Sequence, residues 1–145
     1  MKKLALAGLL SLATSAAAFA AGETHHVAFH VDQNDPKVMT LALNNAENVA
    51  AYYEAQGDEV VIEMVAYGPG LNMFIDGKSP VADRIERMAL EMEGHLTFSA
   101  CGNTLKKMTA KLGSEPPLIS EARVVPAGVV RLMELQEEGY AYIKP

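Results

Sequence analysis

The feature that most constrains this 145-residue chain is a regular alternation of short apolar runs with longer helical stretches. The runs typical of strands lie at residues 26–31, 59–67, 96–100, 122–125 and 140–143, and helices are predicted over residues 36–56, 80–93, 104–112 and 127–138. Strands that alternate with helices of ten or more residues form right-handed βαβ units. We therefore expect an α/β protein of three layers, with a five-stranded, mostly parallel sheet and helices on both faces.

The order of the five strands is predicted from the simplest known arrangement. For five parallel strands this is the flavodoxin-like order 2-1-3-4-5. It places the second strand at an edge of the sheet, where the charge of Glu63 is easier to accommodate. It also makes the first and third strands neighbours.

The first twenty residues have the pattern of a secretory signal peptide. Lys2 and Lys3 precede an apolar stretch from Leu4 to Leu12, and Ala18-Phe19-Ala20 matches an A-x-A cleavage site. The pattern predicts export to the periplasm and a single domain over residues 21–145. The stretch contains polar residues and is a poor membrane span, and no later segment has the ~20 apolar residues that a spanning helix needs.

Composition excludes several classes of function. The chain has a net charge of −6, and residues 1–20 contain two of its 12 basic residues and no acidic one, so residues 21–145 carry −8. Such an acidic balance argues against binding of nucleic acid, which needs a basic face. The glycine spacings of dinucleotide-binding and P-loop proteins are absent, so no nucleotide cofactor is expected.

The single cysteine is the main candidate for chemistry. Cys101 has no disulfide partner in its own chain, so it is either an inert buried thiol or a reactive one. It directly follows the predicted third strand and precedes a helix, at the strand end where open α/β sheets bind ligands. Backbone N–H groups and the dipole at a helix N-terminus lower a thiol pKa, and this context favours the reactive alternative.

Residues near Cys101 have predicted supporting roles. Gly102 is expected to let a substrate approach closely, and Asn103 or Thr104 to cap the helix. Gly68 and Gly70 flank a proline in the loop after the second strand, which is expected to face the same crevice. These residues, with Asp32, are the predicted ligand-binding set.

Histidines offer a second catalytic candidate. His30 lies near the carboxyl end of the first strand, beside the predicted position of Cys101, and is a candidate for proton transfer. Together with Asp32 it leaves a cysteine hydrolase open as an alternative. His95 is expected at the opposite end of the sheet. A metal site is not predicted, because His26 and His30 are roughly 13 Å apart along a strand and His25 points to the other face.

Three segments together resemble the DsrE/DsrF-like family. They are Phe29-His30-Val31-Asp32 before the first helix, Val65-Ala66-Tyr67-Gly68-Pro69-Gly70, and Phe98-Ser99-Ala100-Cys101-Gly102-Asn103-Thr104-Leu105. The resemblance covers essentially all of residues 21–145. It implies a compact α/β fold, assembly as a trimer or hexamer, and a role for Cys101 as acceptor and donor of sulfur in the form of a persulfide.

The expected function is therefore that of an exported sulfur-carrier or thiol-transfer protein, with a sulfur donor or acceptor protein or a small thiol as partner. A non-catalytic ligand-binding or assembly module of the same fold is the alternative. Assembly is also suggested by Tyr140 and Tyr142 on a predicted edge strand, and by the apolar loop at residues 71–75, which a monomer would normally make polar.

Overall fold

The computed structural model describes residues 22–145, and the predicted signal peptide lies outside the described residues. The elements follow one another as β1 (Thr24–Val31), α1 (Pro36–Glu54), β2 (Glu59–Ala66), the 3₁₀ helix η1 (Gly68–Phe74), α2 (Ala82–Glu91), β3 (Leu96–Cys101), α3 (Gly102–Leu112), β4 (Ala122–Val125), α4 (Gly128–Glu137) and β5 (Ala141–Ile143). The predicted alternation is confirmed. All strand pairs in the five-stranded sheet are parallel.

Local sequence signals explain where the helices begin and end. Asp35 is the N-cap of α1 and its side chain accepts a hydrogen bond from the N–H of Lys37 at 2.8 Å, while Pro36 takes the first helical position. Gly113 ends α3 with a φ of 81°, a left-handed conformation that only glycine adopts at no steric cost.

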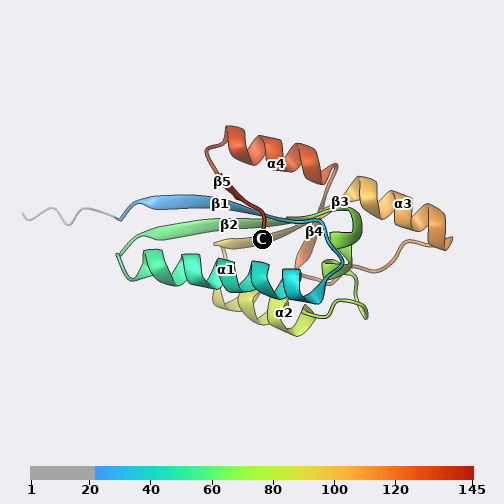
Figure 1. The fold of residues 1–145 in the computed structure, drawn as a ribbon, viewed down its shortest axis with the longest axis horizontal. Helices are drawn as coiled ribbons and strands as arrows, with labels where there is room; N and C mark the ends of the chain where they lie inside the picture. The colour runs from blue at the N-terminus through green and yellow to red at the C-terminus, as the bar shows by residue number, and fades with distance from the viewer. Residues whose placement is uncertain (1–21) are drawn as a thin grey trace, which may run out of the picture.

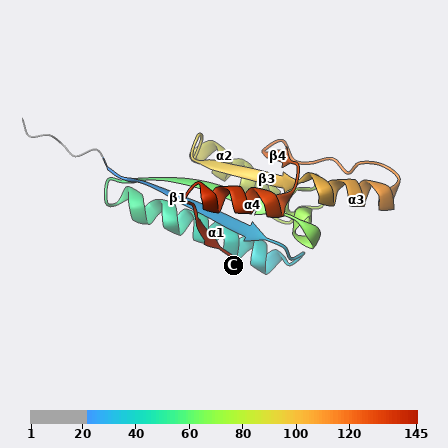
Figure 2. The same ribbon diagram turned by 90° about the horizontal axis from the view of Figure 1, so that it is seen from above.

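The three-layer α/β fold is confirmed, and Figure 1 shows α1 and α2 on one face of the sheet and α4 on the other. Figures 1 and 2 both show α3 beyond the sheet, at the carboxyl end of β3. The larger core lies between the sheet and the layer of α1 and α2. A smaller core lies under α4, formed by Ala28, Val65, Leu132 and Leu135.

The strand order is 4-3-2-1-5, and not the predicted 2-1-3-4-5. The chain moves in one direction across the sheet from β1 to β4, and α4 then carries it back across the opposite face to β5 beside β1. β2 is consequently the central strand, and β1 and β3 are not neighbours. The chain changes direction after β4, so the switch point of the sheet lies between the carboxyl ends of β3 and β4.

The central position of β2 overturns the prediction that Glu63 lies at an edge. Glu63 is 4% exposed, and its carboxylate accepts hydrogen bonds from Ser99 on β3, Arg123 on β4 and Arg131 on α4. A buried charge is tolerated when it is paired and hydrogen-bonded, and here two arginines supply the pairing.

The apolar loop at residues 71–75 is not a surface patch, and this prediction is wrong. Leu71, Met73 and Phe74 are fully buried and Ile75 is 1% exposed, because η1 folds back over the end of the sheet. These side chains belong to the larger core, in which Phe74 packs edge-on against Phe98. They therefore offer no reason for assembly.

Candidate functional site

Cys101 occupies the switch point of the sheet. It is the last residue of β3 and the N-cap of α3, and it pairs in register with Val125 at the end of β4. Its Sγ accepts a hydrogen bond from the backbone N–H of Thr104 at 3.4 Å, so the predicted cap at Asn103 or Thr104 is formed by the cysteine itself. The residue is 5% exposed.

A second helix also begins at this sulfur. The first residue of α4, Gly128, approaches so closely that a Cβ added there would lie 3.1 Å from Cβ of Cys101 and 3.1 Å from the side chain of Tyr67. The backbone N–H of Gly128 also lowers the pKa of the Cys101 thiol. The absence of a side chain at Gly128 therefore lets the positive ends of α3 and α4 meet at one thiol.

These donors lower the pKa of the Cys101 thiol below its ordinary value. Burial raises the pKa, but hydrogen bonds from the side chain of Thr104 and from the backbone N–H groups of Gly128, Thr104 and Asn103 lower it by more. The Thr104 hydroxyl accepts the N–H of Gly68 at 2.9 Å, which leaves its own proton available for the sulfur. A thiolate is the nucleophilic form of cysteine, so the arrangement favours reactivity.

The predicted glycines shape the walls of the site. Gly68 has a φ of 54°, which turns the chain after β2 and presents its N–H to Thr104. A Cβ at Gly70 would overlap the carbonyl group of Val31, so this glycine brings η1 against the end of β1. A Cβ at Gly102 would lie 3.0 Å from the carbonyl oxygen of Val125. The space beside Gly102 is thus filled by β4 and is not open to a substrate.

His30 does not lie next to Cys101, because β2 separates their strands by about 10 Å. Its Nδ1 is 2.7 Å from the hydroxyl oxygen of Tyr142, and its ring centroid is 4.4 Å from that of Tyr67. The pKa of His30 is below its ordinary value, mainly because of burial. The charge of Asp32 raises this pKa, and the charge of Lys144 lowers it further. The hydrogen bonds of residues 22–145 include none between His30 and Cys101.

Asp32 forms an ion pair with Lys144, which follows β5. Its Oδ2 pairs with Nζ of Lys144 at 2.6 Å, and this hydrogen bond holds the pKa of Asp32 below its usual value. The other carboxylate oxygen, and Nε2 of His30, are buried and have no hydrogen-bond partner in the described part of the protein. Cys101, His30 and Asp32 therefore share one end of the sheet without forming a catalytic triad.

The site also contains three residues that were not predicted from the sequence as site residues: Tyr67, Gly128 and Tyr142. Tyr67 follows β2, so the true strand order puts it between Cys101 and His30. Burial raises its pKa, as do the charges of Asp32 and Tyr142, so the phenol stays protonated and is a hydrogen-bond donor. The position of Tyr67 directly after a predicted strand could have indicated a site residue. The role of Gly128 could not be predicted in this way, because it depends on how α4 packs.

The remaining histidines have separate partners. Nε2 of His25 lies 3.1 Å from Oδ2 of Asp58, and its ring stacks on Tyr53. His26 packs edge-on against Tyr140. His95 directly precedes β3, at the end of the sheet opposite Cys101, as predicted. Residues 22–145 contain no cluster of three or more His, Cys, Asp or Glu side chains suited to a metal ion.

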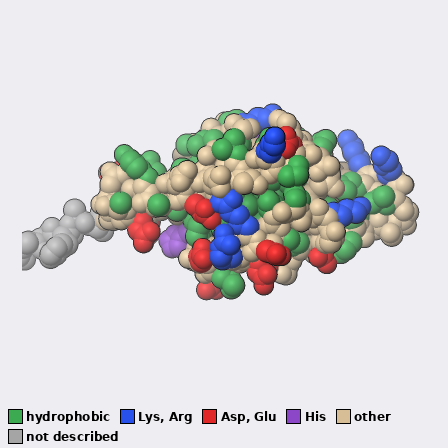
Figure 3. Space-filling model, turned by 60° about the horizontal axis from the view of Figure 1, so that its bottom comes forward, with side chains coloured by type: hydrophobic (Ala, Val, Ile, Leu, Met, Phe, Trp, Pro, Cys, Tyr) green, Lys and Arg blue, Asp and Glu red, His purple; other side chains and the backbone are tan. Residues whose placement is uncertain are grey.

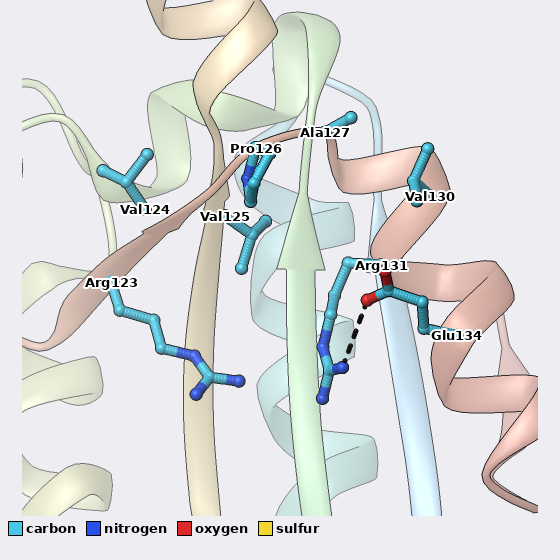
Figure 4. A pocket seen from close by; sticks show the side chains of 8 residues that line it. All are labelled: Arg123, Val124, Val125, Pro126, Ala127, Val130, Arg131 and Glu134. Carbon is cyan, nitrogen blue, oxygen red and sulfur yellow. Dashed lines mark hydrogen bonds and ion pairs between the residues drawn. The ribbon is translucent and has the colours of Figure 1, made fainter.

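A cavity of about 420 Å³ lies between β4 and α4, next to the connection that covers Cys101. Figure 4 shows the side chains of Arg123 and Arg131 extending from these two elements along the same face of the sheet. Both guanidinium groups pair with Glu63, and Arg131 also pairs with Glu134 and Glu138. Their charges are thus balanced within the protein.

The fold and the site define a class: a three-layer parallel α/β protein with one buried cysteine where two helices begin. Among the helices of residues 22–145, none is long and apolar enough to cross a membrane.

No family model and no curated protein matches the chain. The solved structure of MTH1491, a protein of unknown function from Methanobacterium thermoautotrophicum, is similar, with 30% identity, a TM-score of 0.70, and 83% of this chain and 99% of that one covered. The chain belongs to the same family as MTH1491.

Proposed function

We propose that the protein is an exported sulfur-carrier or thiol-transfer protein in which Cys101 accepts and donates a sulfane sulfur. The observation that supports this most directly is the set of backbone N–H groups from α3 and α4 that converge on one sulfur. Such donors stabilise a thiolate, and they would stabilise the anion of a persulfide in the same way. The resemblance to the DsrE/DsrF-like family supports the same role.

The transfer needs no oxidant when the donor already contains sulfane sulfur. The thiolate of Cys101 attacks the outer sulfur of a donor persulfide, an S–S bond forms to Cys101, and the S–S bond of the donor breaks. The electron pair of the broken bond leaves with the donor as its thiolate. With thiosulfate the same attack releases sulfite. Delivery is the reverse reaction, in which an acceptor thiolate attacks the outer sulfur held on Cys101.

The surroundings of the sulfur suit storage of a labile group. Cys101 is 5% exposed, so reductants in solution reach a persulfide there more slowly than they reach an exposed one. The side chain of Tyr67 packs with Cys101 around Gly128, and Asn103 and Thr104 supply polar groups to the site. A carrier needs only this nucleophile, whereas a hydrolase also needs a base to activate water, and β2 keeps His30 away from the sulfur.

Mass spectrometry of the intact protein tests the proposal. After incubation with thiosulfate or with glutathione persulfide, the protein should gain one or more sulfur atoms, and a reducing thiol should remove them. Sulfide alone, without an oxidant, should add none. The Cys101→Ser variant is the control and should gain nothing. Failure of both donors to load the wild-type protein would contradict the proposal.

A second variant separates the carrier from a hydrolase. His30→Ala should leave sulfur loading of Cys101 unchanged, because no hydrogen bond joins the two residues in the described part of the protein. Thioester hydrolysis that is present in the wild type and lost in this variant would replace the carrier proposal.

Assembly is part of the same proposal. We expect a trimer or hexamer from the family resemblance, and Tyr142, which is 42% exposed on the edge strand β5, remains a candidate contact. Light scattering of residues 21–145 at micromolar concentration measures the oligomeric state directly, and a monomer would contradict this part.

A further inference from the structure

A second cavity, of about 350 Å³, borders the cysteine site between η1 and α3. It shares no lining residue with the cavity of Figure 4. Gly68 and Thr104 form part of its wall, and these are the two residues joined by the hydrogen bond beside Cys101. The N–H of Thr104 in turn contacts the sulfur at 3.4 Å. The cavity and the thiol are therefore separated by a single residue.

This cavity is positively charged. Lys78, Lys107 and Lys111 line it, and no acidic side chain does. The ion pairs found among residues 22–145 include none of these three lysines. In Figure 3, Lys and Arg side chains gather at the end of the molecule where α3 lies. In an acidic chain with a net charge of −6, this is a local positive site.

The arrangement of the lysines indicates what kind of ligand fits. Lys107 and Lys111 are four residues apart on α3, which places their Cβ atoms about 6 Å apart on one face of the helix. Lys78 faces them from the connection between η1 and α2. Met108 and Leu112 provide apolar wall between the charges. Two anionic groups joined by a short organic skeleton match this pattern, and a cavity of this size holds a small molecule.

We propose that this cavity binds a small thiol or persulfide that carries two carboxylate groups, and holds it beside Cys101. The binding site follows from the lysines and the cavity alone, whereas the delivery of sulfur from the ligand to Cys101 rests on the proposed function. The cavity of Figure 4 is not the anion site, because Glu63, Glu134 and Glu138 already neutralise its arginines.

Alkylation of Cys101 with two reagents of similar size tests whether the lysines of the cavity attract an anionic ligand toward the thiol. Iodoacetate carries a carboxylate and iodoacetamide does not, and both react with the same thiolate, so the ratio of their rates is independent of the thiol pKa. Lys107→Gln should lower this ratio by up to about fivefold, the range of one exposed ion pair, and Lys111→Gln should lower it less, because it lies about one turn further along α3 from Cys101. Lys106→Gln removes the same charge from the same helix outside the cavity and should have a smaller effect. Equal effects at all three positions would overturn the proposal.

Binding is measured by NMR on the Cys101→Ser variant with glutathione, a thiol with two carboxylates. Amide signals of Gly68, Thr104 and Lys107 should shift, and the shifts should disappear when Lys107→Gln and Lys111→Gln are combined. The diethyl ester of glutathione, which lacks both carboxylate charges, should produce no shifts. The same shifts from a polyglutamate peptide but not from glutathione would overturn the proposal in favour of an acidic protein partner.

The two proposals fail in different ways. If glutathione shifts these signals but no donor loads Cys101, the sulfur-carrier function is wrong and the ligand site stands. If thiosulfate loads Cys101 but glutathione shifts nothing, the ligand site is wrong and the carrier function stands.

Discussion

Replacement of Glu63 by glutamine is expected to destabilise the protein strongly. Glutamine keeps the size of the side chain, but it removes the charge and turns an amide NH₂ toward groups that are themselves donors. The carboxylate of Glu63 accepts from Nε and Nη2 of Arg131 at 2.9 Å each, from Nη2 of Arg123 at 2.9 Å and from Ser99 at 2.6 Å. All four bonds lose their charged acceptor.

The size of the effect follows from the exposure of the two arginines. Breaking a buried ion pair costs about 3–5 kcal/mol. The side chain of Arg131 is only 20% exposed, but it keeps Glu134 and Glu138, and that of Arg123 is 53% exposed and is solvated by water. We therefore expect the free energy of unfolding to fall by about 3 kcal/mol, the lower end of this range. For a domain of this size, this corresponds to a fall in Tm of roughly 10–15 °C.

Urea unfolding at pH 7 and at lower pH is the assay. Burial raises the pKa of Glu63, but hydrogen bonds from Arg131 and Ser99 and the charge of Arg123 lower it by more, so its pKa in the folded state is below the ordinary 4.5. The ionised carboxylate therefore stabilises the fold above pH 4.5, and this contribution is lost as the pH falls through the folded-state value. The difference between wild type and Glu63→Gln should narrow at low pH.

Arg123→Gln is the matched control, because it removes one partner from the exposed side of the same network. It should cost less than about 1 kcal/mol. A Glu63→Gln variant as stable as this control at pH 7, or a difference that persists unchanged at low pH, would refute the argument.

The remaining predictions concern the site and the core. The alkylation rate of Cys101 should have a midpoint below the pH of ~8.5 typical of an unperturbed thiol; a midpoint at or above this value would favour an inert thiol. Gly128→Ala should push the start of α4 away from the sulfur and slow alkylation by iodoacetamide at pH 7, whereas Val129→Ala at the exposed next position should not. Phe74→Asp should unfold the protein, as circular dichroism would show, since the side chain is fully buried; a folded but dissociated protein would contradict this. Burial lowers the folded-state pKa of His30, so unfolded chains bind its proton more readily and the wild type should lose stability as the pH falls below about 6.5. His30→Gln should flatten this dependence in urea titrations between pH 7.5 and 5.5.

Local patterns were sufficient to predict the fold class and the position of the cysteine. The alternation of apolar and helical segments, the Asp35-Pro36 start and glycines such as Gly113 act over a few residues, so they can be read without knowledge of distant contacts. The place of Cys101 between a strand and a helix follows from the same patterns.

Strand order was not predictable from these patterns, and the errors share this cause. A glutamate such as Glu63 is not expected in a central, buried strand. The arginines that compensate its charge, Arg123 and Arg131, are 60 and 68 residues further along the chain, so no local pattern reveals them. The apolar residues of η1 appeared exposed only because nothing in their neighbourhood shows that η1 folds over the end of the sheet.

The sequence by itself determined that this protein is a parallel α/β domain with a thiol at a helix N-terminus, since both properties depend on neighbouring residues. Only the tertiary structure decided which groups surround that thiol. The return of α4 across the sheet brings Gly128 to the sulfur, and the order of the strands inserts Tyr67 between Cys101 and His30. These contacts depend on the direction of each crossover, which is set by packing of whole layers and not by any short segment of the chain.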